Sequence, residues 1–207
     1  MKYFVDNLFP TPIFNSFIDP ISDETKSEIL NLEFEKDKTG FSLSVNNFVL
    51  EMEKFSFLKH QVLKNVEIFT REVLCVDPAI EFYLMNSWVI LQEEDQSTYL
   101  HSHSNSILSG ALYIETDEDS GEIVFEKPYM YNNVFPYSMN FKFTKYNEIN
   151  TQLFKYSPKN NQILIFPSHL KHRVDPNRSL QKRVALSFNL MVRGDFSYSR
   201  INELYLK

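Results

Sequence analysis

Cysteine is almost absent from this sequence, since Cys75 is the only one in 207 residues. A single thiol cannot form an intramolecular disulfide. Long apolar runs are missing as well, because no stretch approaches the ~20 apolar residues of a membrane span. The beginning of the chain, MKYFVDNLFPTPIF, has neither the cationic flank nor the apolar run of a signal peptide. These absences predict a cytoplasmic protein that does not associate with membranes.

An excess of positive charge is also lacking. Lys and Arg number 21 against 27 Asp and Glu, which leaves a net charge of -6. Nucleic-acid binding requires clustered cations that neutralise phosphates, so we expect no direct nucleic-acid partner. Core material is abundant, because 43% of the residues are hydrophobic and 15% are aromatic. This composition argues against disorder, and with no repeat or linker in the chain we expect a single domain over residues 1–207.

The first third of the chain is predicted to form an extended segment followed by helices. Two prolines hold the segment from Leu8 to Phe14 extended, which is typical of an edge strand. The run Ser22-Asp23-Glu24-Thr25 is a helix-start signal, so we expect a helix over residues 21–33. A second helix is predicted over residues 55–76, where apolar residues recur at spacings of three and four: Leu58, Val62, Val66, Phe69 and Val73. Residues 1–79 should therefore brace a sheet.

From residue 80 the periodicity changes to the alternation of β-strands. Strands are expected at residues 80–91, 97–103, 107–115, 122–125, 152–156, 162–166 and 184–192. No regular helices separate them, which favours an antiparallel jelly roll over residues 80–192, followed by a C-terminal tail at 193–207. The fold class is therefore mainly β with bracing α-helices.

Three features between the strands carry further expectations. Gly121 ends an acidic hairpin turn and can take a positive φ. The segment from Pro128 to Asn150 shows little alternation, and a loop of this length is a candidate lid over a binding site. Trp88, the only tryptophan, is interpreted as a core residue.

The histidines are the most specific chemical signal in the chain. His101 and His103 are two residues apart, so on one β-strand their imidazoles point to the same face and can bind one metal ion. A third ligand is expected from His169 or His172. We favour His172, which begins a new extended segment, whereas His169 follows Pro167-Ser168 in what looks like a turn. Arg183 then supplies a cation that can hold an acidic co-substrate beside the metal.

Three segments resemble the iron(II)- and 2-oxoglutarate-dependent oxygenases. They are YLHSHSNSILSGALY at residues 99–113, QILIFPSHLKHRV at 162–174 and RVALSFN at 183–189. In particular they are similar to a subgroup with a His-x-His first motif from bacteria and from viruses of marine bacteria. The resemblance covers about residues 85–192, and the LFPTP segment at 8–12 is also similar. It implies a double-stranded β-helix, a distorted, cupin-like jelly roll that holds Fe(II). It also implies hydroxylation of a substrate C–H bond with release of succinate and CO2.

The resemblance implies a role for each matching residue. The usual triad, His-x-Asp/Glu with a distant His, maps onto His101, position 103 and His172. Position 103 is histidine here, so either three histidines bind the iron or a carboxylate arrives from elsewhere. The carboxylates to check are Glu115, Glu122 and Asp175.

The resemblance assigns the far carboxylate of 2-oxoglutarate to Arg183, whose guanidinium can bind it in a bidentate way. The serine that often follows two residues later is Ala185 here. Ser187 or Tyr99 can supply a hydroxyl instead, and Tyr113 and Asn189 are weaker candidates for contacts with the co-substrate.

Two other functions remain open from the sequence. One is a cupin-like metalloenzyme that does not use 2-oxoglutarate, and the other is a non-catalytic jelly-roll module with a structural or binding role. For the oxygenase, we expect the substrate to be a small molecule or a side chain of a peptide or protein. The oligomeric state is not indicated. The cytoplasm is that of the host if the chain is encoded by a phage.

Overall fold

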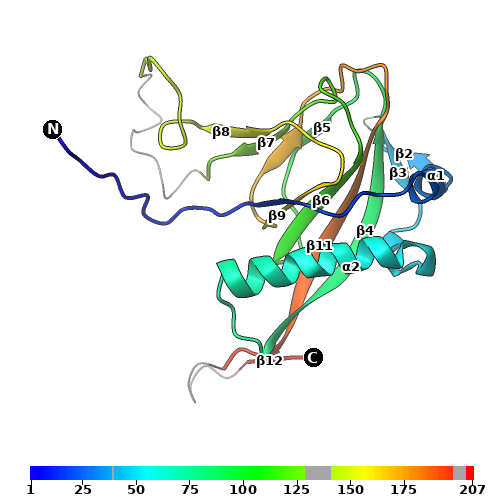
Figure 1. Ribbon diagram of the computed structural model, residues 1–207, viewed down its shortest axis with the longest axis horizontal. Helices are drawn as coiled ribbons and strands as arrows, with labels where there is room; N and C mark the ends of the chain where they lie inside the picture. Colours follow the sequence, from blue (N-terminus) through cyan, green and yellow to red (C-terminus); the bar gives the residue numbers. More distant parts are fainter. Residues whose placement is uncertain (39, 129–140, 198–203) are drawn as a thin grey trace.

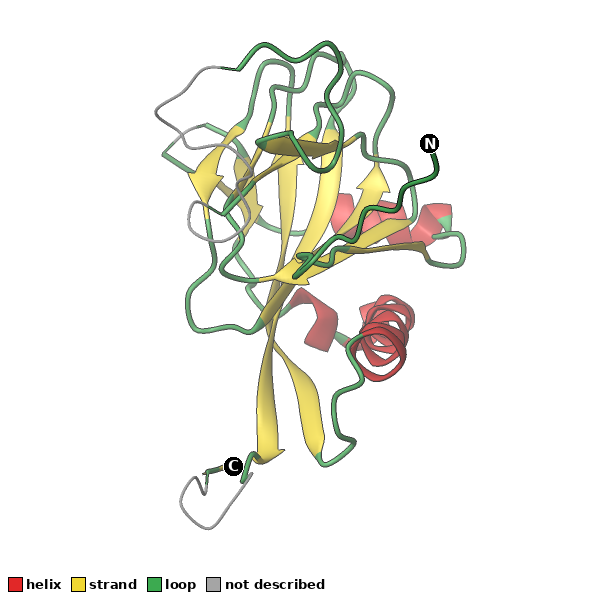
Figure 2. Cartoon of the chain, turned by 90° about the vertical axis from the view of Figure 1, so that its left-hand side faces the viewer, coloured by secondary structure: helices red, strands yellow, loops and turns green. Residues whose placement is uncertain are grey.

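The computed structural model describes residues 1–38, 40–128, 141–197 and 204–207, and its core is a pair of antiparallel β-sheets. The 8-stranded sheet has the order β1 (Phe14–Phe17), β9 (Gln162–Pro167), β6 (Leu108–Glu115), β11 (Arg183–Asp195), β4 (Ile80–Gln92), β3 (Ser42–Ser44) and β2 (Phe34–Lys36), and β12 (Tyr205–Leu206) pairs with β11. The 4-stranded sheet has the order β5 (Thr98–His101), β10 (His172–Val174), β7 (Ile123–Glu126) and β8 (Leu153–Tyr156). The sheets pack face to face, and the helices lie on the outer side of the larger sheet (Figures 1 and 2).

The helices form where their sequence signals predict them. Ser22 caps α1 (Asp23–Leu30), because its hydroxyl accepts a hydrogen bond from the backbone N–H of Thr25 at 3.1 Å. The short 3-10 turns η1 (Val49–Glu51) and η2 (Glu53–Phe55) lead into α2 (Ser56–Glu67), which continues as the π-helical turn η3 (Ile68–Val73). Apolar side chains of these elements pack against the larger sheet. Both predicted helices are confirmed.

Strand β11 is buried on both faces, and the two faces have different contents. Its even-numbered residues from Val184 to Leu190 point into the core beneath the helices. Its odd-numbered residues from Arg183 to Asn189 lie on the opposite face, toward the smaller sheet. The strand therefore connects the scaffold on one side to the candidate site on the other.

Gly110 allows strands β6 and β11 to pack closely beneath the helices. A Cβ atom at this position would lie 2.2 Å from Cζ of Phe188 and 2.7 Å from the backbone oxygen of Leu164. Such contacts are far inside van der Waals distance, so only glycine fits beside the Phe188 ring.

All seven strands expected after residue 80 are present, but two of their ends differ by more than one residue. β11 runs to Asp195, into the segment expected as a tail, and β5 is shorter than predicted. β5 ends at His101, whereas the prediction extended it to residue 103. His103 leaves the strand, and its backbone N–H donates to the oxygen of Ser168 at 2.9 Å. The prediction for Gly121 is confirmed by its φ of 79°. Residues 129–140 of the candidate lid lie outside the described residues.

The N-terminal edge strand is displaced from its predicted position. The prediction placed it from Leu8 to Phe14, but β1 begins at Phe14 and pairs with β9. Pro10 and Pro12 lack the N–H groups that a ladder needs, so pairing starts only after them. The three-residue strands β2 and β3 were not predicted, because so short a run carries almost no alternation signal.

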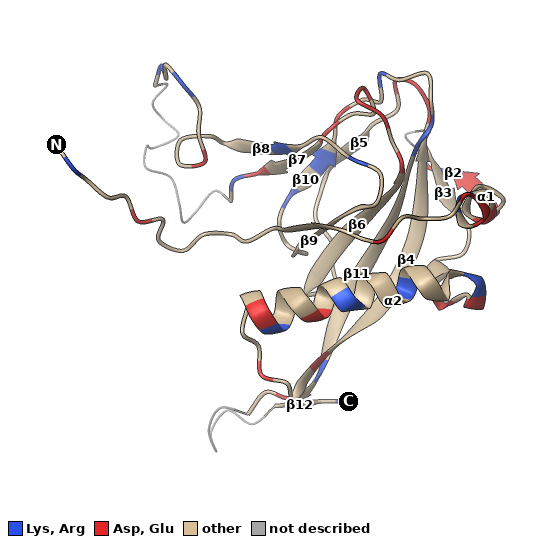
Figure 3. Ribbon diagram, viewed as in Figure 1, with Lys and Arg blue, Asp and Glu red and all other residues tan. Residues whose placement is uncertain are grey.

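The fold class is confirmed as mainly β, with two α-helices bracing a jelly roll. Figure 3 shows charged residues on the helices, the loops and the strand ends, while the middle of the central strands carries none. Among the described residues, the helices are too short or too polar to cross a bilayer.

Candidate metal centre

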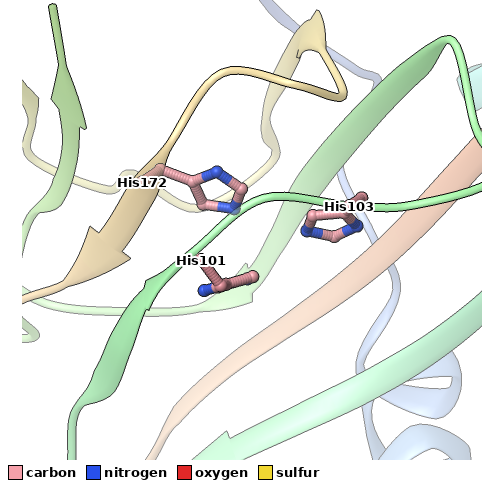
Figure 4. A group of neighbouring side chains, drawn as sticks. All are labelled: His101, His103 and His172. Carbon is pink, nitrogen blue, oxygen red and sulfur yellow. The ribbon is translucent and has the colours of Figure 1, made fainter.

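Three histidines converge between the sheets, two on neighbouring strands and one just beyond the end of a strand (Figure 4). His101 ends β5, His172 begins β10, and the two residues are partners in the antiparallel pairing of these strands. His103 follows two residues after His101. One ring nitrogen of each lies within 4.8 Å of the others, which is close enough for all three to bind a single ion. His169 is exposed and is not part of this group.

Each of the three imidazoles has its Nδ1 atom next to an oxygen. Nδ1 of His101 lies 2.8 Å from the backbone oxygen of Tyr99, and Nδ1 of His172 lies 2.9 Å from that of Leu170. A carbonyl oxygen can only accept a hydrogen bond, so the ring proton sits on Nδ1. The lone pair is then on Nε2, which is the arrangement found for histidines that bind metals.

Two of the histidines, His103 and His172, are held in the uncharged form that binds metals. Burial lowers the pKa of His172 to about 3. Burial likewise lowers the pKa of His103, although its hydrogen bond to Asn189 opposes the shift. Neutral imidazole is the ligand form, so protons do not compete with a metal for these two residues near pH 7.

The structure places the three candidate carboxylates outside this group. Glu122 and Asp175 form ion pairs with Lys155, at 3.1 and 2.8 Å. Glu115 lies at the end of β6. Over the described ranges, no Asp or Glu lines the cavity next to the histidines.

Arg183 is a buried cation in the same cavity. Its side chain lines the cavity together with the three histidines, and the residue is only 2% exposed. Nη1 donates to Oε1 of Gln92 at 2.6 Å, and Cζ lies 5.1 Å from the ring centroid of Tyr113. Nε is buried without a hydrogen-bond partner, and within the described part of the chain no carboxylate pairs with this guanidinium. A buried charge without a counter-ion is unfavourable, and an acidic ligand would neutralise it.

The other residues predicted to contact the co-substrate differ in whether they line the cavity. Ser187 lines the cavity. Tyr113 is fully buried, its ring packs against the Arg183 guanidinium, and burial raises the pKa of its hydroxyl. Tyr99 is 61% exposed and does not line the cavity, so only its backbone oxygen is part of the site. Asn189 contacts His103.

Trp88 was missed as a site residue. It is half-buried, lines the cavity and stacks on His103 with 5.9 Å between ring centroids. The interpretation as a core residue is therefore wrong. The pairing of β4 with β11 would have revealed its position. Trp88 lies opposite Ser187, on the face of the larger sheet that points to the smaller sheet.

The fold and the site together define a class of protein. Two facing antiparallel sheets enclose three clustered imidazoles and one arginine that no described carboxylate pairs with. Imidazole nitrogens bind iron and related metals, and the arginine calls for a carboxylate. This is a jelly-roll metalloprotein built to take an acidic ligand.

The sequence comparison names the family. A family described as "Putative 2OG-Fe(II) oxygenase" matches residues 86–189, half of the 207-residue chain. The chain belongs to this family, so it is an iron(II)- and 2-oxoglutarate-dependent oxygenase, and the two other functions left open by the sequence are not supported. No protein of curated function matches the sequence.

Solved structures share the fold at low sequence identity. A 2OG-Fe(II) oxygenase family oxidoreductase from Burkholderia pseudomallei is 12% identical with a TM-score of 0.56, covering 81% of this chain and 75% of its own. HygX from Streptomyces hygroscopicus, with nickel, 2-oxoglutarate and hygromycin B bound, is 12% identical with a TM-score of 0.57, covering 87% and 82%. A prolyl-4-hydroxylase from Pseudomonas putida is 13% identical with a TM-score of 0.55, covering 89% and 94%.

Proposed function

We propose that this oxygenase hydroxylates a C–H bond of a small molecule or of a side chain in a peptide or protein. In this proposal His101, His103 and His172 hold the iron, and Arg183 holds the far carboxylate of 2-oxoglutarate. One observation carries the assignment. The cavity that contains the three histidines also contains a buried arginine for which the described residues provide no carboxylate.

The side chains present fit both groups chemically. Three imidazole nitrogens are suitable ligands for Fe(II), and their hydrogen bonds already present Nε2 toward the common centre. The guanidinium fits a carboxylate better than an ammonium would, because it offers two parallel N–H groups. When bound, iron and 2-oxoglutarate supply the oxidation: dioxygen is consumed, succinate and CO2 leave, and one oxygen atom enters the substrate.

The protein around the site binds, orients and excludes water. Phe125 and Phe166 pack against the ring of His172, at 5.7 and 4.8 Å between ring centroids. Their apolar rings shield one side of the metal centre from solvent, and a dry site strengthens the pairing of Arg183 with a carboxylate.

A larger cavity, linked to the surroundings of His172 through Phe125, supports the proposed substrate classes. It measures about 710 Å³ and lies between the N-terminal segment and strands β7 and β8. Phe125 lines this cavity and also contacts His172. A volume of this size suits a small molecule or a peptide side chain with its neighbours.

Anaerobic titration of the Fe(II)-loaded protein with 2-oxoglutarate tests the proposal. The weak visible charge-transfer band of the bidentate complex should appear in the wild type and should be lost in His172→Ala. Arg183→Met should require far more 2-oxoglutarate to reach the same absorbance. A metal-loaded wild type without the band would overturn the assignment.

Arg193→Met is a matched control on the same strand. Arg193 is exposed and forms a surface ion pair with Glu81, with N–O distances of 2.6 and 2.8 Å. Its loss should leave the affinity for 2-oxoglutarate within about twofold, because exposed ion pairs contribute little. An equal loss of affinity in both arginine variants would show that the buried position of Arg183 has no special role.

A further inference from the structure

His103 differs from the other two histidines in how it is held. His101 and His172 belong to strands that pair with each other, so the sheet sets their directions. His103 lies beyond the end of β5. The regular alternation of a strand therefore does not orient its ring, and tertiary contacts must do so.

The contact that orients the ring comes from a side chain on the opposite sheet. Nδ1 of His103 lies 2.7 Å from Oδ1 of Asn189, on the inner face of β11. Nδ2 of Asn189 donates to Oδ1 of Asn86 at 2.9 Å, which directs Oδ1 of Asn189 toward His103. That oxygen also accepts a hydrogen bond from Ser109 at 2.7 Å. An oxygen acceptor places the ring proton on Nδ1 and the lone pair on Nε2.

The acceptors of the other two histidines cannot be removed by substitution, because they are backbone oxygens two residues earlier in the chain. Only His103 depends on an acceptor that a side chain supplies. Asn189 is 7% exposed, and its amide is used by three partners from different parts of the fold. One face of the His103 ring is covered by Trp88.

We propose that Asn189 is a positioning residue that makes His103 a metal ligand. The inference rests on the proposed three-histidine centre. Asn189 fixes the tautomer and the direction of a ring that its own strand does not orient, and it does so without adding charge. Its side chain thus acts on the metal through His103 rather than by touching the co-substrate.

Binding of Co(II) in place of iron tests this role without any turnover. The visible absorption of Co(II) reports ligand number and geometry, and emission of Trp88, stacked on His103, reports occupancy. Asn189→Leu removes the acceptor at similar size and should weaken Co(II) binding by about 10- to 100-fold, the usual effect of losing a partner of a metal ligand. Asn189→Asp keeps an acceptor and adds negative charge, so it should bind Co(II) at least as tightly as the wild type.

A double-mutant cycle separates positioning from general damage to the fold. In a His103→Ala background, Asn189→Leu should have almost no further effect on Co(II) affinity, because the ring that it positions is gone. Asn65→Leu is a matched control, since Asn65 is 5% exposed and donates to the backbone oxygen of Gln61 within α2, a helix on the outer side of the larger sheet (Figure 1). It should lower stability but leave Co(II) affinity within about twofold.

The outcomes distinguish this inference from the proposed function. One outcome overturns the role of Asn189 and leaves the proposed function intact. In that outcome His172→Ala loses Co(II) binding, while Asn189→Leu binds Co(II) with the affinity and the spectrum of the wild type. If Asn189→Leu lowers Co(II) affinity as much in the His103→Ala background as in the wild type, Asn189 has a purely structural role. If the wild type itself binds no Co(II), the three-histidine centre fails, and the inference fails with it. Should Asn189→Leu not fold, weaker binding by Asn189→Asp than by the wild type overturns the inference.

Discussion

Replacing Arg183 by methionine should separate co-substrate binding from the stability of the fold. Truncating one partner of a buried charge pair costs ~2–5 kcal/mol of binding free energy. Each ~1.4 kcal/mol is a factor of ten, so the affinity for 2-oxoglutarate should fall by roughly 30-fold to several thousand-fold. The buried position of the guanidinium, at 2% exposure, places the effect in this range rather than in the smaller range of surface pairs.

The stability of the metal-free protein should change much less. Removing a buried charge that lacks a counter-ion favours the variant, because the desolvation of one ion costs several kcal/mol. The variant also leaves Oε1 of Gln92 without its donor, at a cost of ~1–3 kcal/mol, and loses the ring contact with Tyr113, at ~0.5–2 kcal/mol. These terms nearly cancel, so the free energy of unfolding should stay within about 2 kcal/mol of the wild type.

Urea unfolding of the metal-free protein and anaerobic titration with 2-oxoglutarate measure the two quantities. Adding Gln92→Leu removes the orphaned acceptor, so the double variant should be more stable than Arg183→Met alone. If a protein carboxylate neutralised Arg183, the single variant would lose ~3–5 kcal/mol, the cost of breaking a buried ion pair. Such a loss, together with 2-oxoglutarate affinity close to that of the wild type, would refute the reasoning.

Three further predictions concern the same fold. The folded pKa of His172, about 3, lies below its usual 6.5. The unfolded chain therefore takes up more protons as the pH falls through 6.5, and metal-free protein should lose about 1 kcal/mol of unfolding free energy between pH 7 and 5.5. Urea unfolding checks this, and an unchanged slope in His172→Leu would contradict it. Gly110→Ala should destabilise the protein by about 3 kcal/mol, because its Cβ would lie 2.2 Å from the Phe188 ring; a loss under about 1 kcal/mol in urea would disprove the clash. His169→Ala should bind Co(II) as the wild type does, since His169 is exposed and outside the histidine group. If Co(II) no longer quenched the fluorescence of Trp88 in this variant, His169 would have to belong to the metal site.

Much of the fold follows from local periodicity. The 3.6-residue repeat of α2 and the alternation of the strands after residue 80 place each element within a few residues of its position. The misplaced N-terminal strand shows the limit of this reasoning. β1 exists only where β9 supplies a partner, and pairing between residues so far apart in sequence leaves no local pattern.

The candidate site also contains residues that local sequence predicts and residues that only long-range contacts identify. The choice of His172 over His169 was made from the local pattern alone. The role of Trp88 was misjudged and the contact of Asn189 with His103 was not predicted, because both depend on contacts across the sandwich. Trp88 reaches His103 from β4, and Asn189 reaches it from β11.

The sequence by itself determined most of the secondary structure, the family and the two residue types, histidine and arginine, that suit iron and a carboxylate. These are properties of neighbouring residues, and short stretches of chain encode them. Only the tertiary structure decided that His103 stands outside its strand, that no described carboxylate completes the histidine group and that Arg183 has no counter-ion. Such properties depend on what the opposite sheet presents at each position, and burial then sets their energetic weight.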